Sequence, residues 1–196
     1  MNDQAPMTAP IAPFKPIDFL PREIDAERRA NGEIILRQRI PLDAYQRCIP
    51  LYLERWSQER PDQVWLAQRR GPDRAWKKVT YAEAKRDVDA LTQALLDMKL
   101  SPEQPIAILS GNSIEHALMT QAGMQAGIPV APVSPAYSLM SQDHAKLRYI
   151  FDLIKPGVVM VQDGVAFGRA LKALDLSGAT VIHVERAPEG VESRAW

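Results

Sequence analysis

The clearest pattern of hydrophobic and polar positions lies between residues 105 and 137. An apolar run, Ile106–Leu109, is followed by the polar residues Ser110–Asn112, an Ala- and Met-rich stretch, Gly127 and a second apolar run, Pro129–Val133. Two short apolar runs on either side of a helix-length stretch predict a strand, a crossover helix and a second strand. A crossover of this length allows the second strand to run parallel to the first.

The residues around this helix carry signals for its two ends. Asn112 can cap the first turn, and Glu115, three positions on, can reach back to the amide of the capping residue. Gly127 can take the left-handed conformation that ends a helix. Gly123 and Gly127 form a G-x-x-x-G pattern, which we interpret as close approach of the helix to the sheet, because the stretch is too short and too polar for a membrane dimer motif.

The alternation of strand and helix extends from Thr80 to Val184. Thr80 and Glu83 predict a capping box, followed by an apolar stripe that ends at Met98 and is typical of core packing. Further helices are predicted at 141–154 and 165–174, and further strands at 158–161 and 180–184. The fold class is therefore α/β, with an open, mostly parallel sheet and helices on both faces across residues 80–196.

The chain before Thr80 predicts two other regions. Residues 1–21 contain five prolines and predict an extended arm. Residues 22–79 predict elements that cover the sheet: a hairpin at Asn31-Gly32, a helix over 43–60 capped by Asp43, and a second hairpin anchored by its tryptophans. These tryptophans are Trp65 and Trp76.

Composition excludes several classes of protein. Lys plus Arg and Asp plus Glu both number 24, so there is no basic excess to support nucleic-acid binding. The single cysteine, Cys48, permits no intramolecular disulfide and favours a reducing, cytoplasmic location. No apolar run approaches the roughly 20 residues of a membrane span. The first residues also lack the basic and apolar regions of a secretory signal.

The search for catalytic motifs finds none. The sequence has no phosphate-binding G-x-x-x-x-G-K-[ST] loop, no G-x-G-x-x-G fingerprint and no G-x-S-x-G elbow. His116, His144 and His183 are scattered without the spacing of metal ligands, so we expect no metal site. Cys48 follows the pattern of a small buried hydrophobic residue. No residue is predicted to be catalytic.

The topology nevertheless indicates where a ligand would bind. In open α/β sheets, ligands bind beyond the carboxyl ends of the strands, which here are the residues after 109, 133, 161 and 184. Asn112, Ser134 and Tyr137 are the polar or aromatic residues best placed to border such a site. Helix capping is the more ordinary explanation for Asn112, and packing is the alternative for Tyr137.

Three segments resemble the adenylate-forming acyl-CoA synthetases. Lys78–Ala84 (KVTYAEA), Pro105–Asn112 with Glu115, and Gln125–Ser134 resemble family motifs in the same order and spacing. Within the superfamily, SGNSIEHAL, APVSPAYSL and the early Asn-Gly hairpin are most similar to feruloyl-CoA synthases. The resemblance runs from about Phe14 to the C-terminus, and Lys99 departs from it at a turn where many relatives have glycine.

The resemblance implies an enzyme that uses ATP, Mg²⁺ and coenzyme A. It would convert a carboxylic acid, such as ferulic, hydroxycinnamic or another aromatic acid, into an acyl adenylate and then into a CoA thioester. The family's phosphate loop, its adenine- and ribose-binding segments and its catalytic lysine lie downstream of the matched motifs and have no counterpart in these 196 residues. The resemblance therefore implies the N-terminal part of a larger enzyme, inactive by itself.

Two alternatives remain at this point. A free-standing α/β binding or signalling module would need a polar cluster at the strand ends, where the sequence offers only Asp163 and Glu185 as carboxylates. A structural or dimerisation fragment would bind a partner through its proline-rich arm and an uncovered sheet edge. Because uncovered edges and apolar faces pair readily, we expect some self-association.

Overall fold

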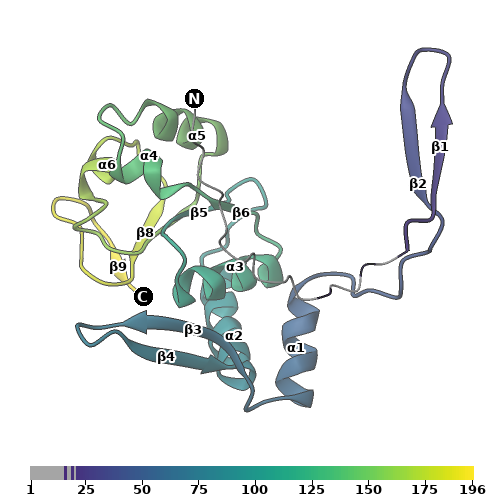
Figure 1. Ribbon diagram of the computed structural model, residues 1–196. Helices are drawn as coiled ribbons and strands as arrows, with labels where there is room; N and C mark the ends of the chain where they lie inside the picture. Colours follow the sequence, from purple (N-terminus) through teal and green to yellow (C-terminus); the bar gives the residue numbers. More distant parts are fainter. Residues whose placement is uncertain (1–15, 17–18, 20) are drawn as a thin grey trace, which may run out of the picture. The chain divides into compact units, whose positions relative to one another are not determined.

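The computed structural model describes residues 16, 19 and 21–196 (Figure 1). The arm predicted for residues 1–21 therefore lies almost wholly outside the described residues. The chain divides into two compact units, residues 1–45 and 46–196, and each is described by itself. In the described residues no helix combines the length and hydrophobicity needed to cross a membrane.

The first unit contains the predicted Asn-Gly hairpin. Strands β1 (Ile24–Arg28) and β2 (Ile34–Gln38) pair antiparallel. Gly32 has a φ of 87°, which only glycine adopts readily, and the side chain of Asn31 accepts a hydrogen bond from the Glu33 amide at 3.1 Å. The hairpin predicted from Asn31-Gly32 is therefore confirmed.

The second unit is built on a five-stranded parallel sheet with the order β6-β5-β7-β8-β9. The strands are β5 (Ile106–Leu109), β6 (Val130–Pro132), β7 (Val158–Val161), β8 (Thr180–His183) and β9 (Arg194–Ala195). Ile106 lies opposite Val130 on one side and Val158 on the other. The predicted parallel sheet is confirmed, whereas β9 was not predicted.

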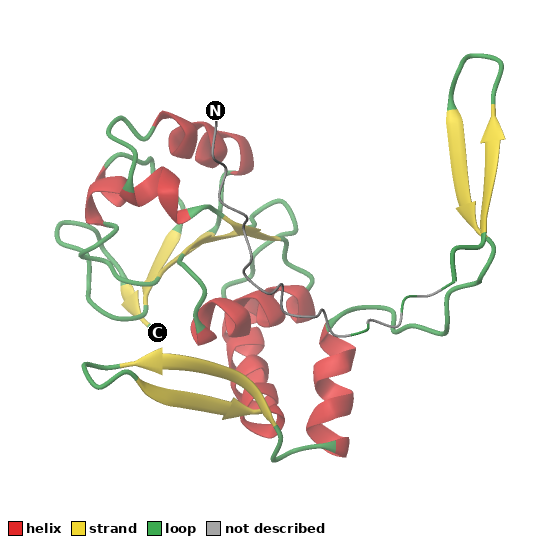
Figure 2. Ribbon diagram, viewed as in Figure 1, coloured by secondary structure: helices red, strands yellow, loops and turns green. Residues whose placement is uncertain are grey.

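Helices cover both faces of this sheet, as predicted (Figure 2). Ile106 and Ile108 face a core formed with α2 (Tyr81–Asp97) and α3 (Ile114–Ala126). Ala107 and Leu109 face the opposite core, which includes residues of α5 (Ala145–Ile154) and α6 (Gly168–Lys172). All four residues of β5 have 0% exposure, so both faces of the strand are buried. This explains why its sequence is apolar throughout and does not alternate between apolar and polar residues.

Two of the helices on the second face are shorter than predicted, and a third was not predicted. α5 (Ala145–Ile154) and α6 (Gly168–Lys172) lie within the helices expected over 141–154 and 165–174, and α4 (Pro135–Leu139) is the additional helix. α5 starts four residues later than expected, because His144 adopts a left-handed conformation with a φ of 52°. The turn before it is held by Ser141, whose hydroxyl accepts a hydrogen bond from the His144 amide at 2.9 Å.

The first core also contains α1 (Pro50–Glu59) and the hairpin of β3 (Val64–Arg70) and β4 (Ala75–Thr80). The predicted cap of α1 by Asp43 is wrong, because the helix begins at Pro50 with no side-chain cap. Proline suits the first helical position, where its missing N–H donor is not needed. The second hairpin and the capping box at Thr80 are both confirmed.

The two predicted tryptophan anchors of the β3–β4 hairpin differ. Trp65 is half-buried and stacks on Tyr81 with 6.1 Å between ring centroids. Trp76 is 55% exposed and lies under the guanidinium of Arg69, so it is not an anchor. Alternation along β4 places Trp76 on the outer face, whereas Val79, the second-to-last residue of the strand, lies on the opposite face and is buried. Cys48 is half-buried rather than buried.

Helix α3 approaches the sheet closely at Gly123, as the G-x-x-x-G pattern predicted. A Cβ atom at this position would lie 2.4 Å from Cγ2 of Val130 and 3.0 Å from Cδ1 of Ile106. Gly127 ends the helix with a φ of 75°. Only a residue without a side chain at position 123 allows the helix backbone to lie this near β5 and β6.

Candidate functional site

The strand order places a topological switch point between β5 and β7. From β5 the chain passes to β6 on one side, and it then returns to β7 on the other side. The connections on the two sides of β5 therefore diverge at its carboxyl end. In open α/β sheets, ligands bind in the crevice that this divergence produces.

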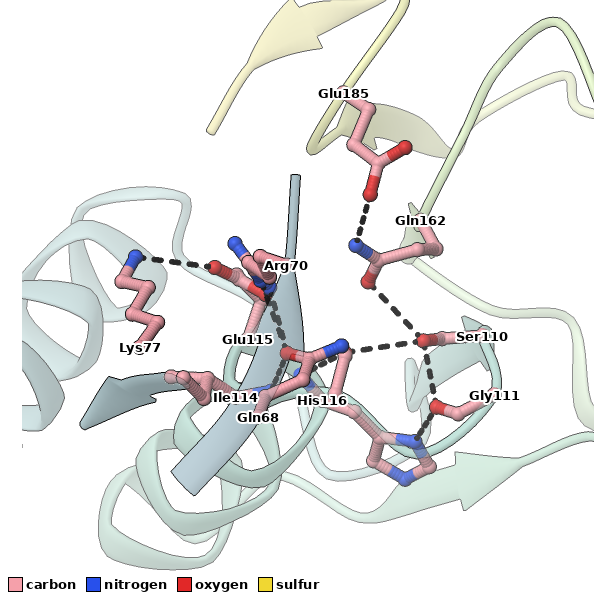
Figure 3. Close-up of polar contacts among 11 residues, drawn as sticks. Gln68, Arg70, Lys77, Ser110, Gly111, Ile114, Glu115, His116, Gln162 and Glu185 are labelled. Carbon is pink, nitrogen blue, oxygen red and sulfur yellow. Dashed lines mark hydrogen bonds and ion pairs between the residues drawn. The ribbon is translucent and has the colours of Figure 1, made fainter. Parts of the chain in front are cut away.

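Three polar residues occupy the carboxyl ends of neighbouring strands (Figure 3). Ser110 follows β5, Gln162 follows β7 and Glu185 lies just after β8. Ser110 Oγ lies 3.2 Å from Oε1 of Gln162, and Nε2 of Gln162 donates to Oε1 of Glu185 at 3.0 Å. Ser110 is 3% exposed, whereas Glu185 is exposed, so the chain of contacts runs from the core to the surface. We call Ser110, Gln162 and Glu185 the edge network.

Helix α3 begins beside this network, and two side chains accept hydrogen bonds from the backbone amides of its first turn. Ser113 is the capping residue, and its hydroxyl accepts a hydrogen bond from the His116 amide at 3.1 Å. Oε1 of Gln68, on β3, accepts from the Ile114 amide at 3.1 Å. The predicted cap by Asn112 is therefore wrong by one residue. Two of the backbone amides in the first turn, those of Ile114 and His116, are hydrogen-bonded to side chains of the protein.

Glu115 has a different role from the capping box that was predicted. Its side chain is 6% exposed and forms an ion pair with Arg70 of β3, while Nζ of Lys77 lies 3.9 Å away. The carboxylate thus joins the first turn of α3 to both strands of the β3–β4 hairpin (Figure 3). Its position also suits the partial positive charge of a helix N-terminus. A tertiary ion pair has replaced the local contact expected from sequence.

The structure separates the three residues expected to border a ligand. Asn112 is exposed and lines a cavity of about 310 Å³ between β3 and α3, together with Gln68 and His116. Ser134 is exposed before α4, and its carbonyl oxygen accepts from the Tyr137 amide at 3.0 Å.

Tyr137 is half-buried, and Nζ of Lys146 lies 5.6 Å from its ring centroid. Ser134 and Tyr137 follow β6, whereas Asn112 follows β5, so they border neighbouring parts of the same sheet edge. All three thus lie near the carboxyl ends of strands, as topology requires, but no hydrogen bond or ion pair among the described residues joins Asn112 to either of the other two.

A second carboxylate at this edge, Asp163, is bound within the protein. Nε of Arg186 donates to Oδ1 of Asp163 at 3.0 Å, and the amide of Val165 donates to the same oxygen at 3.0 Å. The guanidinium of Arg186 holds the pKa of the Asp163 carboxyl below its ordinary value, and backbone amides act in the same direction. The neighbouring Gly164 has no room for a Cβ atom, which would lie 2.4 Å from the Pro188 nitrogen. Asp163 therefore holds the β7 and β8 loops together.

The donor groups in the described residues do not fit a magnesium–nucleotide complex. No three of the His, Cys, Asp and Glu side chains in this part of the chain are grouped so that they could hold a metal ion. Two arginines near this edge are already paired with carboxylates, Arg70 with Glu115 and Arg186 with Asp163. A polyphosphate needs free donors and cations that these pairs do not provide.

The residues of the edge network could not be selected as a site from the sequence alone. The sequence shows that Gln162 and Glu185 follow strands, but only the order of the strands shows that Gln162 contacts both Ser110 and Glu185. The contacts of Gln68 and Arg70 with α3 could not be predicted from any local pattern. They join residues that lie 45 or more positions apart in the sequence.

Comparisons with known proteins agree with this fold. A family model described as "AMP-binding enzyme" matches residues 53–195. A search among curated proteins found no significant match.

Three solved structures are similar. A fatty acyl-adenylate ligase from L. pneumophila, in complex with acyl adenylate and pyrophosphate, is 15% identical with a TM-score of 0.55; the alignment covers 74% of this chain and 24% of that one. A luciferase-like enzyme from the Zophobas morio mealworm is 16% identical with a TM-score of 0.57, covering 76% and 33%. The N-terminal subdomain of Klebsiella oxytoca NpsA, in complex with 3-hydroxyanthranilyl-AMSN, is 20% identical with a TM-score of 0.53, covering 69% and 30%.

The chain thus spans about a quarter to a third of each of these structures. Because the identities are low, these similarities show the fold alone, and the fold corresponds to part of the N-terminal subdomain of NpsA. The family model, in contrast, covers well over half of the 196 residues. The chain belongs to the AMP-binding enzyme family.

Proposed function

We propose that this chain is the N-terminal part of an ATP-dependent ligase that joins a carboxylic acid to coenzyme A. In the first step, the carboxylate attacks the α-phosphate of ATP, giving an acyl adenylate and pyrophosphate. In the second, the thiol of coenzyme A attacks the acyl carbon, which forms the thioester and releases AMP. The observation that carries the proposal is the family match over residues 53–195.

We further propose that the acid is aromatic and of the feruloyl or hydroxycinnamoyl type. This rests on the resemblance of SGNSIEHAL and APVSPAYSL to feruloyl-CoA synthases. One solved structure with the same fold holds an aryl-adenylate analogue, 3-hydroxyanthranilyl-AMSN, but at 20% identity it supports the fold rather than the substrate.

In this proposal, the described residues supply the scaffold of the active site rather than its reactive groups. The edge network links the ends of β5, β7 and β8 by side-chain hydrogen bonds. Stabilising charge on a transferring phosphoryl group requires free cations and donors. Since Arg70 and Arg186 are paired with carboxylates, these groups would come from other parts of the enzyme. The 196-residue chain alone is therefore proposed to be inactive, with Asn112, Ser134 and Tyr137 bordering the completed site.

ATP–pyrophosphate exchange tests the first step. The longest product of the gene should catalyse exchange with ferulate or 4-coumarate and much less with decanoate, whereas the 196-residue chain should show none with any acid. Exchange by the short chain would refute its proposed inactivity. If the long product shows no exchange with any of the acids, adenylation itself is refuted.

The same preparation separates the finer parts of the proposal. Preference for decanoate would refute the aromatic substrate while leaving adenylation intact. Addition of coenzyme A should give AMP and a thioester, detected by its ultraviolet absorbance and by mass spectrometry. Exchange without any thioester would refute the coenzyme A step and favour another acceptor.

A further inference from the structure

The cavity of about 310 Å³ between β3 and α3 has a wall without formal charge. It begins at the connection that follows β5, where Asn112 borders it, and it extends along the first turns of α3 to Ala117. The described residues that line it include no Asp, Glu, Lys or Arg. Because an unpaired charge is costly to remove from water, this wall favours an uncharged group of a ligand.

The imidazole of His116 supplies a hydrogen-bond acceptor at this wall. Its Nδ1 lies 3.0 Å from the carbonyl oxygen of Gly111. Since a carbonyl oxygen only accepts, Nδ1 of the neutral ring carries the proton and Nε2 carries the lone pair. Nε2 lies on the side of the ring away from Gly111, and no described residue donates a hydrogen bond to it (Figure 3). The acceptor is therefore unused.

Gln68 supplies hydrogen-bond donors at the same wall. Its Oε1 accepts from the Ile114 amide at 3.1 Å and from Nε and Nη2 of Arg70 at 3.1 and 2.9 Å. These three donors fix which end of the side-chain amide is the oxygen. Its Nε2 carries two N–H groups, and no described residue accepts a hydrogen bond from them. An unused donor and the unused acceptor of His116 thus border one cavity.

We propose that this cavity binds the phenol group of a small aromatic molecule. The phenolic O–H donates to Nε2 of His116, and the phenolic oxygen accepts from Nε2 of Gln68. A phenol is a stronger donor than an aliphatic alcohol, yet with a pKa of about 10 it is uncharged at neutral pH. The ring contacts the apolar part of the wall, which includes Leu66, Ile114 and Ala117.

The size of the cavity limits the ligand to a small one. Its volume of about 310 Å³ is at the lower end of the range of roughly 300–1,000 Å³ that ligand sites occupy. A single ring with short substituents therefore suits it better than a nucleotide does. The inference does not depend on the proposed ligase activity, because it requires neither ATP nor a carboxylate.

Titration of the ¹⁵N-labelled 196-residue chain with phenol, followed by NMR, tests the site. The amide resonances of Gln68, Ile114 and Ala117 should shift saturably, with a Kd on the order of 1 mM for so small a ligand. Anisole has a methyl group in place of the hydroxyl proton and should bind roughly three- to tenfold more weakly, because it cannot donate. The ¹⁵N resonance of Nε2 of His116 should move with phenol and not with anisole. This readout uses the parent chain and needs no variant.

Two variants separate recognition of the hydroxyl from the space available. His116→Phe keeps a ring but removes the acceptor, so phenol should bind it no better than anisole does. Ala117→Leu fills the cavity and should abolish binding of both compounds. The matched control is Met124→Leu, on the same helix but away from this cavity, which should change neither affinity.

Four results would overturn the proposal. They are the absence of a saturable shift with phenol, equal affinity of the parent chain for phenol and anisole, a preference for phenol that persists in His116→Phe, and binding that survives Ala117→Leu. An Nε2 resonance of His116 that phenol leaves unchanged would equally exclude the proposed hydrogen bond.

Discussion

Replacing Gly123 with alanine should destabilise the second unit although alanine is the better helix former. Gly123 lies in the interior of α3 and faces β5 and β6. An added Cβ would lie 2.4 Å from Cγ2 of Val130 and 3.0 Å from Cδ1 of Ile106. Both distances are shorter than ordinary carbon contacts of roughly 3.5–4.0 Å. Either the helix must move away from the sheet or these side chains must change rotamer.

Two opposing effects determine the magnitude. Alanine in a helix interior is favoured over glycine by about 1 kcal/mol. Overpacking a well-packed core costs about 1–3 kcal/mol, and the cost should be in the upper half of that range because valine has a stiff χ1 angle and cannot swing aside. The closer contact is the one with Val130. The free energy of unfolding should therefore fall by a net amount of about 1–2 kcal/mol.

Urea unfolding followed by far-UV circular dichroism measures this change, and the chain contains a matched control. Gly168 is also buried in a helix, α6, but a Cβ there would meet nothing within 4 Å. Gly168→Ala should thus be neutral or stabilising by up to about 1 kcal/mol. Adding Val130→Ala to Gly123→Ala should recover part of the lost stability. The free energy of unfolding of the double variant should fall by less than the sum of the decreases in the two single variants. A Gly123→Ala protein as stable as the parent would refute the close contact.

Two further predictions concern the ion pairs. Glu115→Gln should lower the free energy of unfolding by about 1–3 kcal/mol, since a buried carboxylate is removed from the half-exposed cations Arg70 and Lys77; an unchanged urea midpoint would contradict this. Asp163→Asn should destabilise the protein at neutral pH through loss of the Arg186 pair. Because the folded pKa of Asp163 is lowered, its contribution is present above about 4, the ordinary aspartate pKa, and is lost as the pH falls through the lower folded value. The difference in urea midpoint between parent and variant should thus disappear in acid, and a constant difference would contradict it.

The strands of the sheet could be predicted from sequence because they are buried on both faces. β5 and β7 are four-residue apolar runs bounded by polar or turn residues, and each was placed to the residue. β9 could not be predicted in the same way. Arg194–Ala195 is short and polar, and it forms a strand only because the edge of β8 is free to pair with it. Its existence depends on a neighbour in space rather than on its own residues.

The helix starts show the limit of local capping rules. Thr80 and Glu83 form the predicted capping box, because no described residue forms an ion pair with the exposed Glu83 carboxylate. Glu115 occupies an equivalent position relative to Asn112, but Arg70 of the neighbouring hairpin binds it instead. A local rule therefore holds only where no stronger tertiary partner lies within reach.

The candidate site depends in the same way on the order of the strands. The sequence places Ser110, Gln162 and Glu185 after three strands, but it does not say which strands are neighbours. Once β7 lies beside β5, Ser110 and Gln162 come within hydrogen-bond distance although 52 positions separate them. Each contact contributes only about 0.5–1.5 kcal/mol, because water or a ligand can replace it. A polar ligand that reaches the switch point can thus exchange its own hydrogen bonds for those of the edge network, while the buried core of β5 and β7 keeps the strand ends in place.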